Sequence, residues 1–184
     1  MQKKPNQPDL KDIDESETED VDTADGSKVY LVVASENEEF NLSLRYAARI
    51  AHKNKAQVGI LFVIDEEDFH HWGEVESIIQ QELRHKAETF LWESAKKINE
   101  LNGKLPIFYI AEGTKIDSII KTIESDPTIK TLILSGRTGP GGPGNLVGYF
   151  TGKGLSRLTV PLTLVPGNIE PHRIDAIMGT KIQG

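Results

Sequence analysis

Cysteine is absent from this sequence of 184 residues, aromatic residues make up only 7%, and no long apolar run occurs. Without cysteine the chain has no disulfide framework, no thiolate metal site and no catalytic thiol. It has no run of about 18 apolar residues typical of a transmembrane helix, and its first residues lack the apolar core of a secretory signal. We therefore expect a cytoplasmic protein with no membrane partner.

Basic residues are scarce in the first part of the chain. Residues 1–27 hold nine aspartates and glutamates against three lysines, a net charge of −6, whereas the remaining 157 residues carry a net charge of −1. The segment has no aromatic residue, so we predict a disordered acidic tail. An acidic tail and the lack of a basic stripe elsewhere argue against a nucleic-acid partner. One hypothesis is that this tail lies over basic groups of the folded part and opposes anion binding.

Short apolar runs alternate with helical periodicities from residue 28 onward. The runs are short and rich in β-branched residues, which is typical of strands buried on both faces of a sheet. The predicted strands cover residues 29–34, 58–64, 107–110, 131–134 and 162–165. Four helical patterns between them predict an α/β, Rossmann-like fold with a doubly wound five-stranded parallel sheet and helices on both faces. We expect the folded domain over residues 28–167 and a C-terminal tail over 168–184.

Local signals predict several helix ends. Ser35 stands three residues before Glu38, which is the spacing of a capping box at the start of a helix. Gly103 follows the longest helical pattern, where a left-handed cap is expected. The Asp126-Pro127 pair ends the next helical pattern.

Ligands of a doubly wound sheet bind beyond the carboxyl ends of its strands, at the point where the strand order reverses. The loops after Ala34, Ile64, Ala111 and Ser135 are therefore the candidate ligand loops. The last of these is distinctive because residues 135–154 hold eight of the sixteen glycines.

Glycine lets the backbone approach a ligand closely, and successive N–H groups can cradle phosphate oxygens. A helix that starts near Gly144–Asn145 would add the positive end of its dipole, and Arg137 and Lys153 could neutralise a polyphosphate. The alternative is a flexible connection made turn-prone by two prolines. A Walker A loop is excluded, because the GYFTGKG stretch has three residues between its glycines and lacks the magnesium-binding hydroxyl.

Three stretches resemble the universal stress protein family. They are VYLVVASENEEFNLSLRYAARIA, AEGTKIDSIIKTIESDPTIKTLILSG and GNLVGYFTGKGLSRLTVPLTLVPG, within residues 28–166. The resemblance implies a five-stranded doubly wound fold and dimers formed through the last strand. The family includes branches that bind ATP and branches that do not.

The motif of the ATP-binding branch is only partly matched. Gly136 and Gly139 stand where G-x2-G begins, and Gly148 resembles the third glycine after eight residues rather than nine. Tyr149 then occupies the hydroxyl position, and Ser35 follows the first strand where the family has an aspartate near the ribose. An alternative frame over residues 139–153 restores nine residues but places a lysine at the hydroxyl position. The candidate nucleotide-binding residues are Ala34, Ser35, Val63, Gly136, Arg137, Gly139, Gly148 and Tyr149, for ATP or another adenine nucleotide with Mg²⁺.

No catalytic residue is predicted, because no serine lies in a nucleophile elbow and no nucleophile–base pair can be identified. Glu67 and His71 have the i, i+4 spacing of two zinc ligands, but a solvated loop explains them better. We therefore predict no metal site, and the residues do not establish an enzyme activity.

The last predicted strand is expected at a sheet edge, where unpaired backbone groups favour pairing with another strand. It has no charged side chain to prevent such pairing. The resemblance likewise implies a homodimer through this strand. The candidate interface residues are Leu162, Thr163, Leu164 and Val165.

Two hypotheses of function follow. The first is a cytoplasmic, dimeric regulatory or interaction module of the universal stress protein type, with a degenerate nucleotide pocket and no turnover. The second is a true adenine-nucleotide binder, with slow ATPase activity as a further option.

Overall fold

The computed structural model describes residues 28–64 and 76–179. The predicted acidic tail (1–27) and the Glu67–His71 pair lie outside the described residues. Within them, no helix is both long enough and apolar enough to cross a membrane.

The centre of the structure is a five-stranded sheet in which all neighbouring strands are parallel. The strands are β1 (Val29–Val33), β2 (Gln57–Ile64), β3 (Ile107–Glu112), β4 (Ile129–Gly136) and β5 (Leu162–Pro166). Their order across the sheet is β3-β2-β1-β4-β5. The doubly wound α/β fold predicted from the sequence is confirmed, as is the edge position of the last strand.

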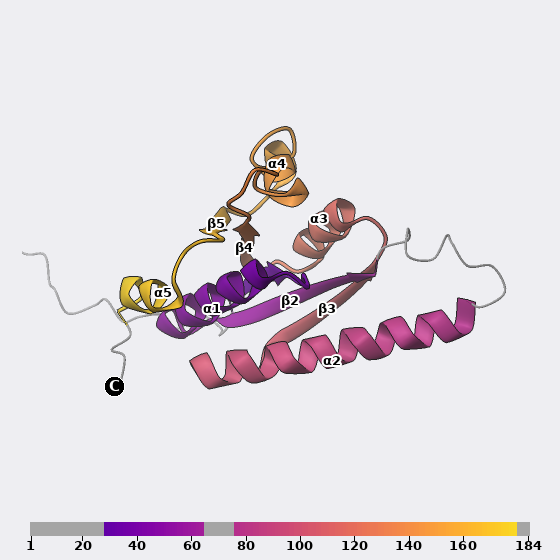
Figure 1. Ribbon diagram of the computed structural model, residues 1–184, viewed down its shortest axis with the longest axis horizontal. Coiled ribbons are helices and arrows are strands. Elements are labelled where there is room, and N and C mark those ends of the chain that lie inside the picture. The colour runs from indigo at the N-terminus through magenta and orange to yellow at the C-terminus, as the bar shows by residue number, and fades with distance from the viewer. Residues whose placement is uncertain (1–27, 65–75, 180–184) are drawn as a thin grey trace, which may run out of the picture.

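Helices cover both faces of this sheet (Figure 1). They are α1 (Glu38–Lys53), α2 (Glu76–Asn102), α3 (Lys115–Ser125), α4 (Asn145–Phe150) and α5 (Pro171–Ile177). One buried cluster joins α1, α2 and α5 to the sheet, and a second joins α3 and α4 to it. Successive side chains of β1 alternate between the faces, so Val32 packs in the first cluster and Leu31 and Val33 in the second.

The helix boundaries confirm most of the local signals. Gly103 follows α2 with a φ of +73°, the left-handed conformation expected of a C-terminal cap. The predicted capping box at Ser35 is wrong: Asn37 caps α1, and its Oδ1 accepts a hydrogen bond from the Phe40 amide at 3.0 Å. The reason is that the Ala34 amide still bonds to Leu61 of the neighbouring strand, so Ser35 is too close to the strand end to cap a helix.

The chain after β5 turns back onto α1. Ile174 of α5 is fully buried, and the carboxylate of Asp175 accepts hydrogen bonds from both Arg45 and Arg49 of α1. Residues 168–179 therefore pack against the folded body through both apolar and charged contacts.

Candidate functional site

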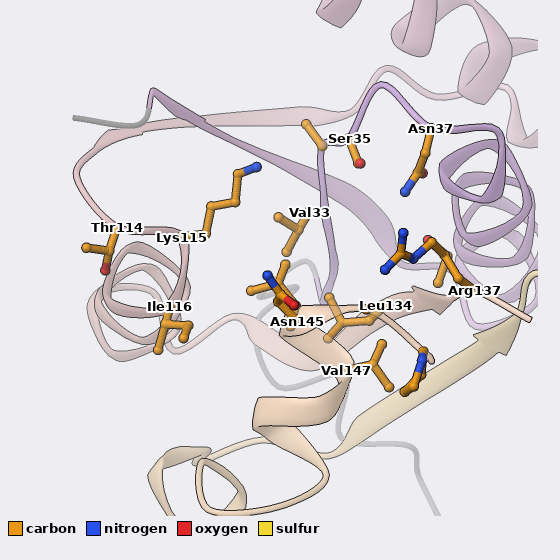
Figure 2. A pocket seen from close by; sticks show the side chains of 15 residues that line it. Val33, Ser35, Asn37, Thr114, Lys115, Ile116, Leu134, Arg137, Asn145 and Val147 are labelled. Carbon is orange, nitrogen blue, oxygen red and sulfur yellow. The ribbon is translucent and has the colours of Figure 1, made fainter. Parts of the chain in front are cut away.

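A cavity of about 720 Å³ lies beyond the carboxyl ends of β1 and β4. These two strands are neighbours, but the chain leaves β1 into α1 on one face and leaves β4 toward α4 on the other. The connections at their ends therefore diverge and leave a crevice, which is the usual ligand position in doubly wound sheets. The residues that line it are Val33, Ala34, Ser35, Asn37, Thr114, Lys115, Ile116, Leu134, Ser135, Arg137, Pro143, Gly144, Asn145, Leu146 and Val147 (Figure 2).

The cavity has an apolar surface at its centre with polar residues on both sides of it. Val33 and Leu134, from the ends of β1 and β4, lie between two groups of polar residues in Figure 2. Thr114 and Lys115 lie on one side of them, and Asn37 and Arg137 on the other. An apolar surface with a few placed polar groups is typical of a small-molecule site.

The charges of the lining have one sign. Lys115 and Arg137 line the cavity, and no aspartate, glutamate or histidine of the described residues does so. Neither cation forms an ion pair with a described carboxylate. The electrostatics therefore favour an anion in this cavity.

Two long helices begin at the rim of the cavity. Asn37 caps α1 and Thr114 caps α3, so the positive ends of both helix dipoles lie at the rim. The Thr114 hydroxyl is occupied by its own helix: it donates to Asp117 at 2.9 Å and accepts from the Asp117 amide at 3.3 Å. Arg157 hydrogen-bonds to the Asp117 carboxylate as well and, together with Thr114, holds its pKa below the usual range.

Three of the residues predicted from the sequence line the cavity, namely Ala34, Ser35 and Arg137. Val63 does not line it and packs with the cluster under α3 instead. Gly136 ends β4, where its carbonyl accepts a hydrogen bond from the Gly167 amide at 2.7 Å.

The other predicted glycines lie outside the cavity lining. Gly139 belongs to a turn in which its carbonyl accepts from the Gly142 amide at 3.1 Å. Gly148 lies inside α4, because this helix begins at Asn145, next to its cap Gly144, as the sequence predicted. Its backbone N–H bonds to Gly144 within the helix and cannot also cradle a phosphate.

Tyr149 also lies outside the lining. Its ring packs edge-on against Phe150, and its hydroxyl accepts a hydrogen bond from Arg157 at 2.9 Å. A Cβ at Gly154 would come within 2.2 Å of this ring, so the absence of a side chain there makes room for the tyrosine. Tyr149 thus connects α4 to the following turn and to α3 through Arg157.

Sequence reasoning missed Asn37, Lys115 and Asn145 as lining residues. Because ligands bind beyond the carboxyl ends of the strands, the connection after Ala111 was expected to be a ligand loop. No pattern within that loop indicated which of its side chains would line the site. Lys115 becomes a site residue only because α3 starts beside the ends of β1 and β4.

The predicted interface strand lies at a sheet edge, and its four residues differ in exposure. Leu162 and Thr163 are half-buried, and Leu164 is 41% exposed. Val165 is 2% exposed and packs in the core, so only its backbone is available to another chain.

The arrangement defines a doubly wound α/β protein with an anion-favouring cavity at its switch point, and comparisons with known structures specify the fold further. No family model matches the chain, and no curated protein matches it. UspA of Lactobacillus plantarum has 15% identity and a TM-score of 0.61, over 75% of this chain and 97% of that one. A universal stress protein in complex with cAMP has 10% identity and a TM-score of 0.54, over 77% and 98%. A universal stress protein of Archaeoglobus fulgidus in complex with dAMP has 12% identity and a TM-score of 0.51, over 75% and 96%.

The chain therefore has the universal stress protein fold, and the resemblance noted in the sequence is confirmed at the level of the fold.

Proposed function

We propose that this protein is a universal stress protein module that binds an adenine nucleotide in the cavity between β1 and β4. The observation that carries this proposal is that the apolar side chains of Val33 and Leu134 and two cations line the same cavity at the switch point of the sheet. The apolar residues suit a flat base, and Lys115 and Arg137 suit phosphate oxygens. The volume of about 720 Å³ is within the usual range of small-molecule sites.

The related structures support a nucleotide of this class. Two proteins of the same fold were solved with cAMP and with dAMP. Both ligands combine an adenine base with a phosphate, which is the combination that the cavity of this chain suits.

The module acts by binding and not by turnover. Within the part of the cavity that the structure describes, the lining has no histidine or carboxylate that could serve as a general base. Binding would then be transmitted through α1, α3 and α4, which all begin at the cavity. A role in stress regulation and a cytoplasmic location belong to this proposal.

A second candidate is a dimeric regulatory module that works without nucleotide. It is favoured by the positions of Gly139, Gly148 and Tyr149, which leave the glycine-rich motif outside the cavity lining. Such a module would act through its dimer and its protein partners.

Isothermal titration with ATP, with and without Mg²⁺, separates the two candidates. Micromolar binding that weakens about tenfold or more in Arg137→Ala supports the first, because a charged hydrogen bond contributes about 1.5–3 kcal/mol. Arg173→Ala is the matched control, since Arg173 is an exposed arginine on α5 and does not line the cavity. No heat up to millimolar ATP, together with no thermal shift, would favour the second candidate.

The proposed homodimer uses the edge of β5. Leu164→Lys places a charge on the exposed side chain of that edge and is expected to give a monomer at micromolar concentration. Ile110→Lys is the matched control: Ile110 is 60% exposed on β3, the opposite edge of the sheet, and the change should leave the dimer intact. Sedimentation of the wild type as a monomer would contradict the proposal.

A further inference from the structure

Lys115 occupies an electrostatically unfavourable position. It is the first residue of α3, directly after the cap Thr114, where the partial positive charge of the helix dipole lies. An acidic side chain stabilises such a position and a lysine destabilises it. No described carboxylate pairs with Lys115 to offset this effect.

Arg137 faces the same cavity from the opposite side. In Figure 2, Lys115 extends from the start of α3, and the guanidinium of Arg137 reaches inward from the end of β4. The Arg137 side chain lies along the glycine-rich loop, because a Cβ at Gly144 would be 3.7 Å from its Nε and one at Gly141 would be 3.9 Å from its Nη2. The guanidinium therefore lies beside this loop, within van der Waals reach of it, at the edge of the cavity.

Lys115 and Arg137 share one cavity in which the described lining residues include no acid, so the two cations repel each other, and Lys115 also opposes a helix dipole. Charged residues in electrostatically unfavourable positions are expected where a site is adapted to bind a ligand of opposite charge. A ligand with one negative charge offsets one cation, whereas a ligand with two or more offsets both.

We propose that Lys115 and Arg137 form a two-cation clamp for the phosphate chain, so that the site selects nucleotides with at least two negative charges and does not require Mg²⁺. This inference rests on the proposed nucleotide site and goes beyond it by naming the ligand class and the residue on α3. Mg²⁺ finds no carboxylate ligand among the described lining residues, so the phosphate oxygens would be its main charged ligands there. There it competes with Lys115 and Arg137 for the same oxygens.

The first test compares ligands that differ in charge. In titrations of the full chain, affinity should rise from adenosine to AMP to ADP, and cAMP, with one negative charge, should bind more weakly than AMP. Chelation of Mg²⁺ with EDTA should leave the ADP affinity unchanged or raise it. A requirement for Mg²⁺, or equal affinity for adenosine and ADP, would overturn the clamp.

The second test compares Lys115→Gln with Lys121→Gln. Lys121 is an exposed lysine of the same helix. It lies four residues after Asp117, and its positive charge stabilises the ionised form of that carboxyl group. Lys115→Gln should weaken ADP binding about tenfold or more and leave adenosine binding unchanged. Lys121→Gln should change neither affinity.

The same two variants have a readout without ligand. Lys115→Gln should raise the Tm of the ligand-free protein by about 1–3 °C, because it removes a cation from a helix N-terminus. Lys121→Gln should leave the Tm unchanged or lower it. If Lys115→Gln lowers the Tm and binds ADP as the wild type does, the clamp is wrong while the nucleotide site stands. If the wild type binds no nucleotide, with or without Mg²⁺, both proposals fail.

Discussion

The contact between α5 and α1 allows a quantitative prediction for Asp175→Asn. The Asp175 side chain is 6% exposed and accepts hydrogen bonds from Nε of Arg45 at 3.1 Å and from Nε of Arg49 at 2.9 Å. A second bond joins Nη2 of Arg45 to the other carboxylate oxygen. Asparagine has nearly the same shape, but it removes the charge, and the two partly buried arginines then have no counter-ion among the described residues.

The expected loss of stability follows from the burial of the three groups. Removing one partner of a fully buried ion pair costs about 3–5 kcal/mol, and an exposed pair contributes about 1 kcal/mol or less. The Arg45 and Arg49 side chains are 31% and 17% exposed, so this cluster lies between the two limits. We expect Asp175→Asn to lower the free energy of unfolding by about 2–3 kcal/mol.

The same cluster predicts a dependence on pH. Hydrogen bonding to Arg45, and also to Arg49, holds the pKa of Asp175 below its ordinary value, so folding favours the charged form. Its contribution to stability is therefore present in full above about pH 4, the pKa of an unfolded aspartate, and is lost as the pH falls toward the lower folded pKa. The stability of Asp175→Asn should fall less steeply over that acidic range than the stability of the wild type.

Urea unfolding followed by circular dichroism, from pH 7 down to pH 3, measures both effects. Hydrogen exchange of residues 171–179 detects the case in which α5 detaches before the rest of the protein unfolds. Asp117→Asn is the matched control, because its pair with Arg157 is exposed, with side chains 51% and 44% exposed. The reasoning is refuted if Asp175→Asn destabilises the protein no more than Asp117→Asn does and leaves the protection of α5 unchanged.

Three further predictions concern the sheet and the acidic tail. Gly59→Ala should lower the free energy of unfolding by about 1–3 kcal/mol, because the new Cβ would lie 2.8 Å from side-chain atoms of both Tyr109 and Val29. An unchanged midpoint of urea unfolding would contradict this, because it would mean that the sheet accommodates the methyl group. Tyr109→Phe removes the 2.6 Å hydrogen bond to Asp126, and an NMR titration should show the pKa of Asp126 rising toward its ordinary value while the bonds from Thr128 keep it partly lowered. Deletion of residues 1–27 should raise the affinity for ADP at low salt and not at high salt in calorimetry, and equal affinities at low salt would exclude an inhibitory tail.

The alternation of strands and helices could be predicted from the sequence because it depends on local periodicity. β1 is a continuous apolar run since both of its faces are covered, and α1 has apolar residues at helical spacing since one side of it packs on the sheet. Gly103 and Gly144 were found for the same reason, because a helix end needs a particular residue at a particular place in the chain. The fold class and most boundaries follow from such local rules.

The composition of the cavity could be predicted only in part. Ser35 was found because it stands near the end of β1, where the family has an aspartate, and Arg137 because it is a cation directly after β4. Gly148 and Tyr149 were chosen from a motif, yet α4 begins early enough to include both of them. Gly144 marks where α4 begins, but the motif does not reveal that Val147 and Phe150 pack against the sheet and hold Gly148 and Tyr149 within this helix.

By itself, the sequence determined a doubly wound α/β protein with its ligand loops at one end of a parallel sheet. The tertiary structure alone decided which side chains meet there. The order β3-β2-β1-β4-β5 places β1 beside β4, and this brings Lys115 and Arg137 to the same cavity from separate loops. It likewise brings Asp175 to Arg45, residues separated by 130 positions in the chain. Periodicity reports which face of an element is buried, but it carries no information on the partner that covers that face.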